Sequence, residues 1–316
     1  MDYPEQETLT ISADKLGFAT PTSMIFLTKV CRQRAKKHRN ETRKFFGLSK
    51  HDYANNLGFS KALNLKGNPF QQGAFGGNNY IPISLMQKDV LEEAAADKFI
   101  HLGDEIEQRC GSLAKVVSQG KGRELERALQ ISFREIIRNS FEHGETNEVT
   151  FCAQHWPQRE QVEICIADKG IGVRASLESG KYNIPKNDQD ALKYSIMPGV
   201  SSKAWRNKKK RASQKSEWDN AGYGLFFAHH LFGNLGHFFI GSGDSGLLLS
   251  KDKKMELPCK IEGTLVSLNL DLSCEGSILE ALNGISKQSH KIKTRLGVKS
   301  LDLAEIDSYL KANKLE

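Results

Sequence analysis

Polar side chains recur at every fourth position along residues 133–144, FREIIRNSFEHG. If the segment is a helix, Glu135, Asn139 and His143 lie along one face, because residues four apart are neighbours on a helix surface. The opposite face carries apolar side chains at the same spacing, namely Phe133, Ile137 and Phe141. We expect this apolar face to pack on a sheet. For the helix alone, an amphipathic helix with a polar solvent face is the simpler explanation.

Alternation of apolar and polar residues predicts strands elsewhere in the chain. The segments 147–154 and 161–168 are two such strands joined by a turn, and the second ends at Asp168. Further strands are expected at residues 8–11, 42–48 and 263–272, and a hairpin with a glycine-rich turn at 237–241 and 246–250. Helices are expected at residues 22–38, 52–63, 88–118, 123–143, 173–180, 187–197 and 225–233.

A segment dense in Gly, Asn and Pro, residues 64–82, predicts a loop or linker between domains. The length of 316 residues allows two domains. We therefore expect an N-terminal domain at 1–85, a second domain at 86–274 and a helical tail at 275–316.

The composition is that of an ordinary soluble protein, with 39% apolar and 26% charged residues. No apolar run is long enough to span a bilayer, and the first ten residues lack a signal-peptide pattern. We expect a cytoplasmic protein that does not enter a membrane. The six cysteines are scattered without a C-x-x-C pair, which favours reduced thiols over disulfides or a zinc site.

The net charge of +7 is concentrated in two segments. Residues 32–44 hold seven Lys or Arg against Glu41, and residues 199–221 hold seven against two acidic residues. Such patches bind nucleic acid, a phosphate-bearing ligand or an acidic partner. For residues 32–44 a solvated surface is the simpler interpretation.

Three glycine motifs follow the 123–143 helix in a fixed order. They are Asp168-Lys-Gly170-Ile-Gly172 after an apolar strand, Gly222-Tyr223-Gly224-Leu225 before a helix, and Gly263-Thr264 at the start of a strand. Each is weak alone. Together with Glu135 and Asn139 they resemble the GHKL superfamily of ATP-binding domains, over roughly residues 90–272. The resemblance implies an α/β fold, a two-layer sandwich of a mixed sheet and helices.

The resemblance also implies an adenine site. Asp168 would accept a hydrogen bond from the exocyclic amine of adenine, which favours adenine over guanine because guanine has a carbonyl there. Gly170 and Gly172 would let the backbone pass close to the base. A hairpin turn is the alternative for these glycines, but no partner strand follows. Thr264 would reach adenine, often through water, and a purely structural strand threonine is an equal alternative.

At the phosphate end, the resemblance gives Asn139 as the ligand of Mg²⁺, which prefers oxygen ligands. Glu135, one turn earlier, would take a proton from water in hydrolysis or from a protein hydroxyl in kinase activity. His143 would contact a phosphate or cap the helix.

By position, residues 199–221 correspond to the ATP lid of the superfamily. Gly222 and Gly224 end it, and Tyr223 and Leu225 stand at the start of the next helix, whose free N–H groups suit a triphosphate. Lys203, or another cation among Arg206 and residues 208–211, would add a phosphate contact.

The order of elements in residues 1–85 resembles a STAS-like domain, the partner fold of anti-sigma-factor kinases. Proteins of that type carry a phosphorylatable Ser or Thr at the start of their first helix. Here Thr22 and Ser23 stand at that place, without the usual Asp-Ser-Ser-Gly. A helix N-cap is the alternative role for either residue.

One further glycine pattern is rejected. Residues 241–246 fit the dinucleotide-binding fingerprint, but a strand-like segment follows where that fingerprint requires a helix. The chain also contains no G-x-x-x-x-G-K-[ST] loop.

Three functions are compatible with these patterns. The first is a Mg²⁺-dependent ATP-binding protein, an ATP-driven conformational switch with slow ATP hydrolysis. The second is a serine/threonine kinase of the anti-sigma type, acting on a STAS-like partner. The third is a non-catalytic nucleic-acid-binding module, against which the intact Glu135 and Asn139 pair argues. ATP or ADP and a protein are the expected partners, and the frequent dimerisation of GHKL proteins leaves a homodimer open.

Overall fold

A computed structural model gives the fold of the chain and describes residues 6–63, 79–179, 185–198, 200, 224–251 and 253–273, with positions 278, 280, 281 and 284. The described α-helices are α1 (Pro21–Lys37), α2 (Asp52–Asn56), α3 (Phe59–Ala62), α4 (Lys88–Asp97), α5 (Leu102–Ser118), α6 (Arg123–Glu142), α7 (Gly172–Glu178), α8 (Asp188–Ser195) and α9 (Gly224–Leu235). The strands are β1 (Thr8–Ser12), β2 (Thr42–Phe46), β3 (Tyr80–Gln87), β4 (Glu148–Trp156), β5 (Gln161–Asp168), β6 (Gly236–Ser250) and β7 (Lys253–Asp271). The 3₁₀ helices are η1 (Leu48–Lys50) and η2 (Pro157–Arg159).

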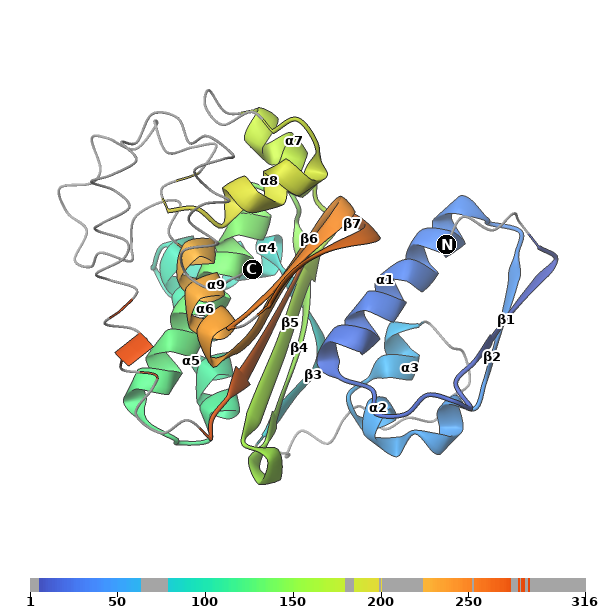
Figure 1. The fold of residues 1–316 in the computed structure, drawn as a ribbon, viewed down its shortest axis with the longest axis horizontal. Helices are drawn as coiled ribbons and strands as arrows, with labels where there is room; N and C mark the ends of the chain where they lie inside the picture. Colours follow the sequence, from blue (N-terminus) through green and yellow to red (C-terminus); the bar gives the residue numbers. More distant parts are fainter. Residues whose placement is uncertain are drawn as a thin grey trace.

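In the described part of the chain, the main sheet has five strands in the order β3-β4-β5-β7-β6 (Figure 1). Every neighbouring pair in it is antiparallel. The α/β class is therefore confirmed, but the mixed sheet that we expected is wrong for the described strands. Short turns that reverse the chain join β4 to β5 and β6 to β7, and the longer connections through helices also return antiparallel. β5 is the central strand, so the residue at its end, Asp168, has a strand on either side.

Helices α5, α6 and α9 lie on one face of this sheet (Figure 1). The apolar face predicted for α6 packs there, with Phe133, Ile137 and Phe141 all buried in the main core. The predicted solvent face of α6 is only partly correct, because Glu135 is also buried. The helix is therefore enclosed between the sheet and its neighbouring helices over most of its length.

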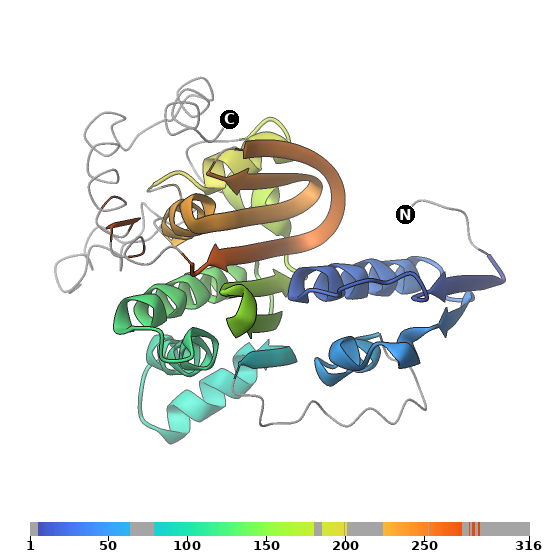
Figure 2. The same cartoon turned by 60° about the horizontal axis from the view of Figure 1, so that its bottom comes forward.

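The N-terminal segment covers the other face of the sheet. β1 and β2 form a parallel pair connected by α1, and Figures 1 and 2 both show the segment on the side away from α5 and α9. Met24 and Ile25 of α1 are buried in one cluster with the side chains of Cys152 and Cys165, which stand opposite each other on β4 and β5. The N-terminal segment thus shares a hydrophobic core with the sheet.

The proposed boundary at residue 85 runs through a strand. Residues 80–87 form β3, an edge strand of the main sheet, where we expected the end of a loop. Pro82 and a register shift between Ile81 and Ser84 obscure its pattern, and both features are typical of edge strands. The tail at 275–316 lies outside the described residues except for four positions, of which Ile278 and Ala281 pack against the main core.

Two predicted helices are divided in the structure. The helix expected at 52–63 is interrupted at Gly58, whose φ of 82° breaks the helical path. The helix expected at 88–118 is interrupted near Phe99, which has φ 55°. The N-cap of α1 is Thr20, whose side chain accepts a hydrogen bond from the Ser23 amide, so the cap role expected for Thr22 or Ser23 is wrong.

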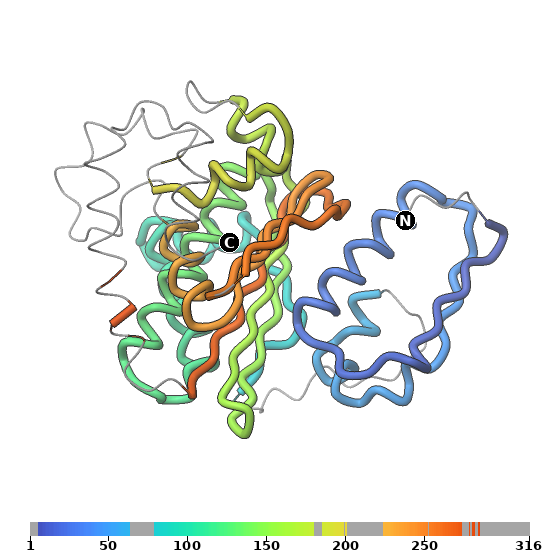
Figure 3. The backbone as a smooth tube through the Cα atoms, viewed as in Figure 1, coloured from blue at the N-terminus to red at the C-terminus, as the bar shows by residue number. Residues whose placement is uncertain are grey.

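The hairpin expected within residues 237–250 is also wrong. β6 runs continuously from Gly236 to Ser250 and pairs with β7 along its length. Figure 3 shows the two strands as a long pair that curves toward α7 and α8. Gly243 has φ 62° at a shift in this ladder, so the glycines permit a bulge within a strand and do not form a turn.

Candidate functional site

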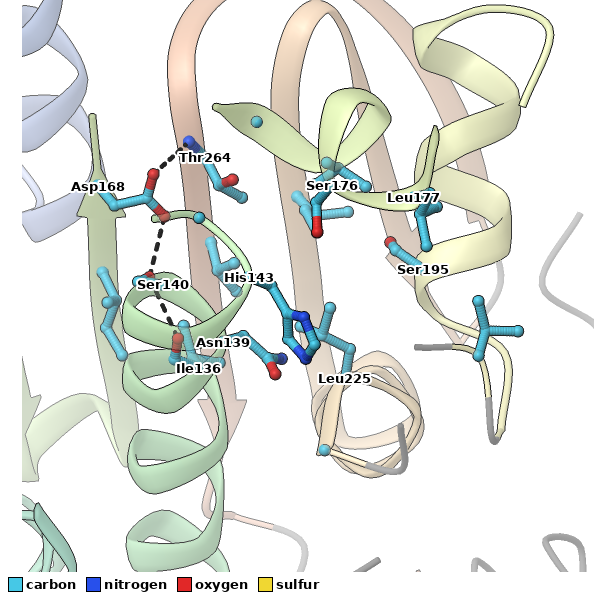
Figure 4. A pocket seen from close by; sticks show the side chains of 18 residues that line it. Ile136, Asn139, Ser140, His143, Asp168, Ser176, Leu177, Ser195, Leu225 and Thr264 are labelled. Atoms are coloured by element: carbon cyan, nitrogen blue, oxygen red, sulfur yellow. Dashed lines mark hydrogen bonds between the residues drawn. The ribbon is translucent and has the colours of Figure 1, made fainter. Parts of the chain in front are cut away.

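A cavity lies among the C-terminal end of α6, the end of β5 and the start of α9 (Figure 4). Its volume is about 90 Å³. The predicted site residues that line it are Asn139, His143, Asp168, Gly172, Gly224, Leu225 and Thr264. Residues that are far apart in the sequence are thus brought together around one cavity.

Asp168 is held in a single orientation at one side of the cavity. Its Oδ1 accepts hydrogen bonds from the backbone amides of Gly170 at 2.8 Å and Thr264 at 3.1 Å. Its Oδ2 accepts one from the Ser140 hydroxyl at 2.9 Å (Figure 4). A carboxylate has about four acceptor positions, so a further donor can still bind. Asp168 is therefore a buried, fixed acceptor.

Two glycines around Asp168 are required by close backbone contacts. A Cβ on Gly170 would overlap the backbone carbonyl of Gly144. Gly263 has φ 71°, and a Cβ there would lie 2.6 Å from Asp168 Oδ1. Gly170 itself does not line the cavity and shapes the loop behind it, whereas Gly172, with φ 81°, does line the cavity.

Ser140 is a site residue that the sequence analysis missed. It lies next to Asn139 on α6 and also contacts the Ile136 carbonyl at 3.2 Å. A serine inside a helix commonly bonds only to that carbonyl four residues earlier, so its pattern gave no signal of a long-range partner. Ser176 and Ser195 also line the cavity from α7 and α8.

Most of the remaining lining is apolar. These side chains come from the helices and strands on all sides of the cavity: Ile136, Ile166, Val173, Leu177, Val200, Leu225, Ile240 and Val266. Such a lining suits the apolar part of a ligand, and the polar atoms at the Asp168 end can orient it.

Asn139 and His143 lie apart from Asp168, near Leu225 at the start of α9 (Figure 4). His143 is the C-cap residue of α6, and its backbone amide donates to the Asn139 carbonyl at 2.8 Å. His143 therefore both ends the helix and lines the cavity. The amide side chain of Asn139 offers an oxygen ligand there.

Glu135 does not line the cavity, although it was the candidate catalytic base. Its carboxylate is paired with Arg134 at 2.9 Å and lies 3.8 Å from Arg138. Burial raises the pKa of Glu135, against the opposing effect of these two arginines. Its role as a base stays a prediction.

Glu135 instead packs against the first residue of α9. A Cβ added to Gly224 would overlap the Glu135 side chain and come 2.7 Å from Oε2. A carboxylate at this place faces the positive end of a helix, where a negative charge is favourable. The predicted phosphate site at the start of α9 is therefore close to Glu135, while Lys203, Gly222 and Tyr223 lie outside the described residues.

Lys29 reaches the site from the opposite face of the sheet. Its Nζ donates a hydrogen bond to the backbone carbonyl of Asp168. Burial lowers the pKa of Lys29, and the nearby Asp168 carboxylate opposes that shift. The start of α1 is anchored as well, since the Thr22 amide donates to Glu163 at 2.9 Å and its hydroxyl contacts Ser267 at 2.6 Å.

Comparisons with protein-family models, with curated proteins and with solved structures found no match. No helix in the described part of the chain combines the length and apolar character needed to cross a membrane. Within the same residues, no group of three His, Cys, Asp or Glu side chains is arranged to hold a metal ion. The geometry of the cavity is therefore the basis for any functional inference.

Proposed function

We propose that the protein binds Mg²⁺-ATP in this cavity as a GHKL-type domain and acts as an ATP-driven conformational switch with slow hydrolysis. The observation that carries the proposal is the Asp168 carboxylate, fixed by three hydrogen bonds at the edge of an apolar cavity. A fixed acceptor beside apolar walls matches a base that is flat and carries an amine donor.

The acceptor-only character of Asp168 supports selectivity for adenine. An ionised carboxylate accepts the adenine amine but meets the guanine carbonyl oxygen with repulsion. Because Ser140, Gly170 and Thr264 already hold the carboxylate, it cannot turn away without losing those bonds. We expect ATP and ADP to bind and GTP to bind much more weakly.

The other end of the cavity supports phosphate binding. α9 begins at Gly224, and its first N–H groups and positive dipole end suit an anionic group. Asn139 supplies one amide oxygen, which fits Mg²⁺ because this ion usually keeps several waters and takes further ligands from phosphates. Bound Mg²⁺ would neutralise charge on the phosphates.

The position of Glu135 is compatible with slow turnover. Its carboxylate is buried, paired with Arg134 and outside the cavity lining, so it is not poised to activate a water molecule in this conformation. A protein that changes shape on binding ATP does not need rapid hydrolysis.

Calorimetry of ATP binding to wild type and Asp168→Asn tests the proposal. Asn keeps an oxygen for the Gly170 and Thr264 amides, and its amide can donate to Ser140, so the fold should be retained. Toward adenine, however, a charge-assisted bond worth about 1.5–3 kcal/mol is lost. We expect ATP to bind about 10- to 150-fold more weakly.

Asp271→Asn is the matched control. Asp271 also ends a strand and accepts bonds from Ser273, but it pairs with Gln161 at the opposite end of β5. ATP affinity should be unchanged in this variant. Equal ATP affinity in wild type and Asp168→Asn, or equal binding of ATP and GTP, would overturn the adenine assignment.

A further inference from the structure

A second hollow lies between the C-terminal half of α1 and β2. Figure 2 shows α1 and β2 on the side of the sheet away from α6 and α9. Its volume is about 800 Å³. We call it the basic groove, because five cationic side chains from four segments line it: Arg32, Lys36, Arg39, Arg43 and Lys169. The basic segment at residues 32–44 therefore lines a concave surface.

The acidic side chains near the basic groove do not cancel this charge. Among the described lining residues Glu41 is the one carboxylate, and Arg34 holds it in a buried ion pair at 2.5 Å. That contact lowers the pKa of Glu41, so its charge is already neutralised inside the protein.

Two other carboxylates pair with cations that line the basic groove. Glu262 pairs with Lys36 at 3.2 Å, with 44% and 62% of the two side chains exposed. Glu148 pairs with Lys169. Exposed pairs of this kind contribute little energy, and a phosphate can compete for their cations.

Apart from Thr42, the remaining lining of the basic groove is apolar. Cys31, Ala35 and Leu63 contribute to it, together with the half-buried ring of Phe45. Phe45 lies two residues after Arg43 on β2, so both side chains face the groove from the same side of the strand. An aromatic ring beside cations is the arrangement on which nucleic-acid bases stack in single-strand binding proteins.

We propose that the basic groove binds the phosphate backbone of single-stranded nucleic acid without sequence preference. Arg32 and Lys36 are one helical turn apart, about 6 Å along the axis, and Arg39 continues beyond the end of α1. Cations distributed along a groove suit a chain of phosphates better than one compact phosphate group. A hollow also suits a strand better than a flat membrane surface.

Fluorescence anisotropy with a labelled 20-nucleotide oligo(dT), titrated at several salt concentrations without ATP, tests the proposal. Arg39 and Arg43 are both exposed, so the double variant R39E/R43E should fold. We expect it to bind at least tenfold more weakly. Its slope of log affinity against log salt should be shallower by about 1.4, because each single-strand phosphate contact contributes about 0.7.

The matched control is R123E/K253E, which makes the same change in net charge at exposed positions on α6 and β7, outside the groove lining. It should bind almost like wild type, and R39K/R43K should keep most of the salt slope. The proposal is overturned if wild type does not bind oligo(dT), or if the two charge-reversal variants lose affinity equally. It is also overturned if only inorganic phosphate or vesicles of anionic lipid bind.

Discussion

Asp168 is oriented by donors from three separate parts of the chain, namely Ser140 on α6, the loop amide of Gly170 and the β7 amide of Thr264. None of these bonds is local to a helix or a regular strand ladder. A ligand that binds Asp168 therefore meets a group whose orientation was fixed when the protein folded. Preorganisation of this kind lowers the entropic cost of binding.

The candidate site could be predicted in part from the sequence, because its residues stand in glycine motifs with a recognisable order. Asn139, Asp168 and Thr264 were found in this way and do meet in one cavity. Ser140 was missed because its partner is 28 residues away and a helical serine has an internal acceptor. Glu135 was expected on a polar face but is buried, since periodicity cannot show that α9 packs over it.

The titration of Glu135 should appear in the pH dependence of stability. Its pKa is raised by burial in the folded protein, so between the unfolded and folded pKa values the folded state binds more protons. The free energy of unfolding therefore falls as pH rises through that window. Glu135→Gln cannot titrate, so its stability relative to wild type should increase as the pH rises above about 4.3, the pKa of an unperturbed glutamate.

Urea denaturation at a series of pH values measures this difference. Glu142→Gln is the control for removing one carboxylate from the same helix, because Glu142 is exposed and pairs with Arg138. A stability difference between Glu135→Gln and wild type that stays constant with pH, or decreases, contradicts a raised pKa at Glu135.

At the scale of elements, α1 links the two faces of the sheet. Its residue Lys29 donates to the Asp168 carbonyl, while Asp168 accepts hydrogen bonds on the cavity side. Lys29→Met removes a charge-assisted bond worth about 1.5–3 kcal/mol. Part of that energy should appear as weaker ATP binding, by a few-fold to about tenfold, because the Asp168 loop is held less firmly. Calorimetry measures the change.

Lys36→Met is the control, since Lys36 lies on the same helix but pairs with the exposed Glu262. ATP affinity should be unchanged in this variant. If both substitutions leave ATP affinity at the wild-type value, α1 does not support the nucleotide loop.

The predicted helices and strands agree with the structure where the hydrophobic periodicity is strong. They disagree where a local pattern, such as a pair of glycines, is compatible with more than one structure. α6, β4 and β5 were expected close to their observed bounds. β6 was divided in error because Gly241 and Gly246 resemble a turn, yet a Cβ at either position would press against the Phe239 ring. These glycines leave room for the Phe239 ring beside the strand. That requirement becomes visible only when β6 is seen paired with β7.

The whole molecule has α5, α6 and α9 on one face of the sheet and α1 on the other. Two predicted domains were inferred from a glycine-rich segment, but composition cannot show whether two segments share a core. Met24 and Ile25 of α1 lie in one cluster with Cys165 and Leu265 of the central strands. Separating the N-terminal segment would expose that face of the sheet, so the two parts should depend on each other for stability.

We therefore expect one cooperative unfolding transition for the described core. Trp156 lies 5.5 Å from the Phe18 ring, across the contact between the N-terminal segment and the sheet. In a protein with Trp205 and Trp218 replaced by Phe, its fluorescence reports this contact, while far-UV circular dichroism reports the helices and strands. The two urea transitions should coincide, as two-state unfolding requires.

One substitution in each of the two hydrophobic clusters tests the same expectation from both faces of the sheet. Met24→Ala removes a fully buried side chain from the cluster around α1, and Leu129→Ala removes one from the core around α6. Each should cost about 2–5 kcal/mol of unfolding free energy. Because the two clusters lie on opposite faces of one sheet, each substitution should shift the fluorescence and circular dichroism transitions together. If Met24→Ala shifts only the Trp156 transition and Leu129→Ala leaves that transition in place, the N-terminal segment unfolds independently, and the two-domain interpretation is the correct one.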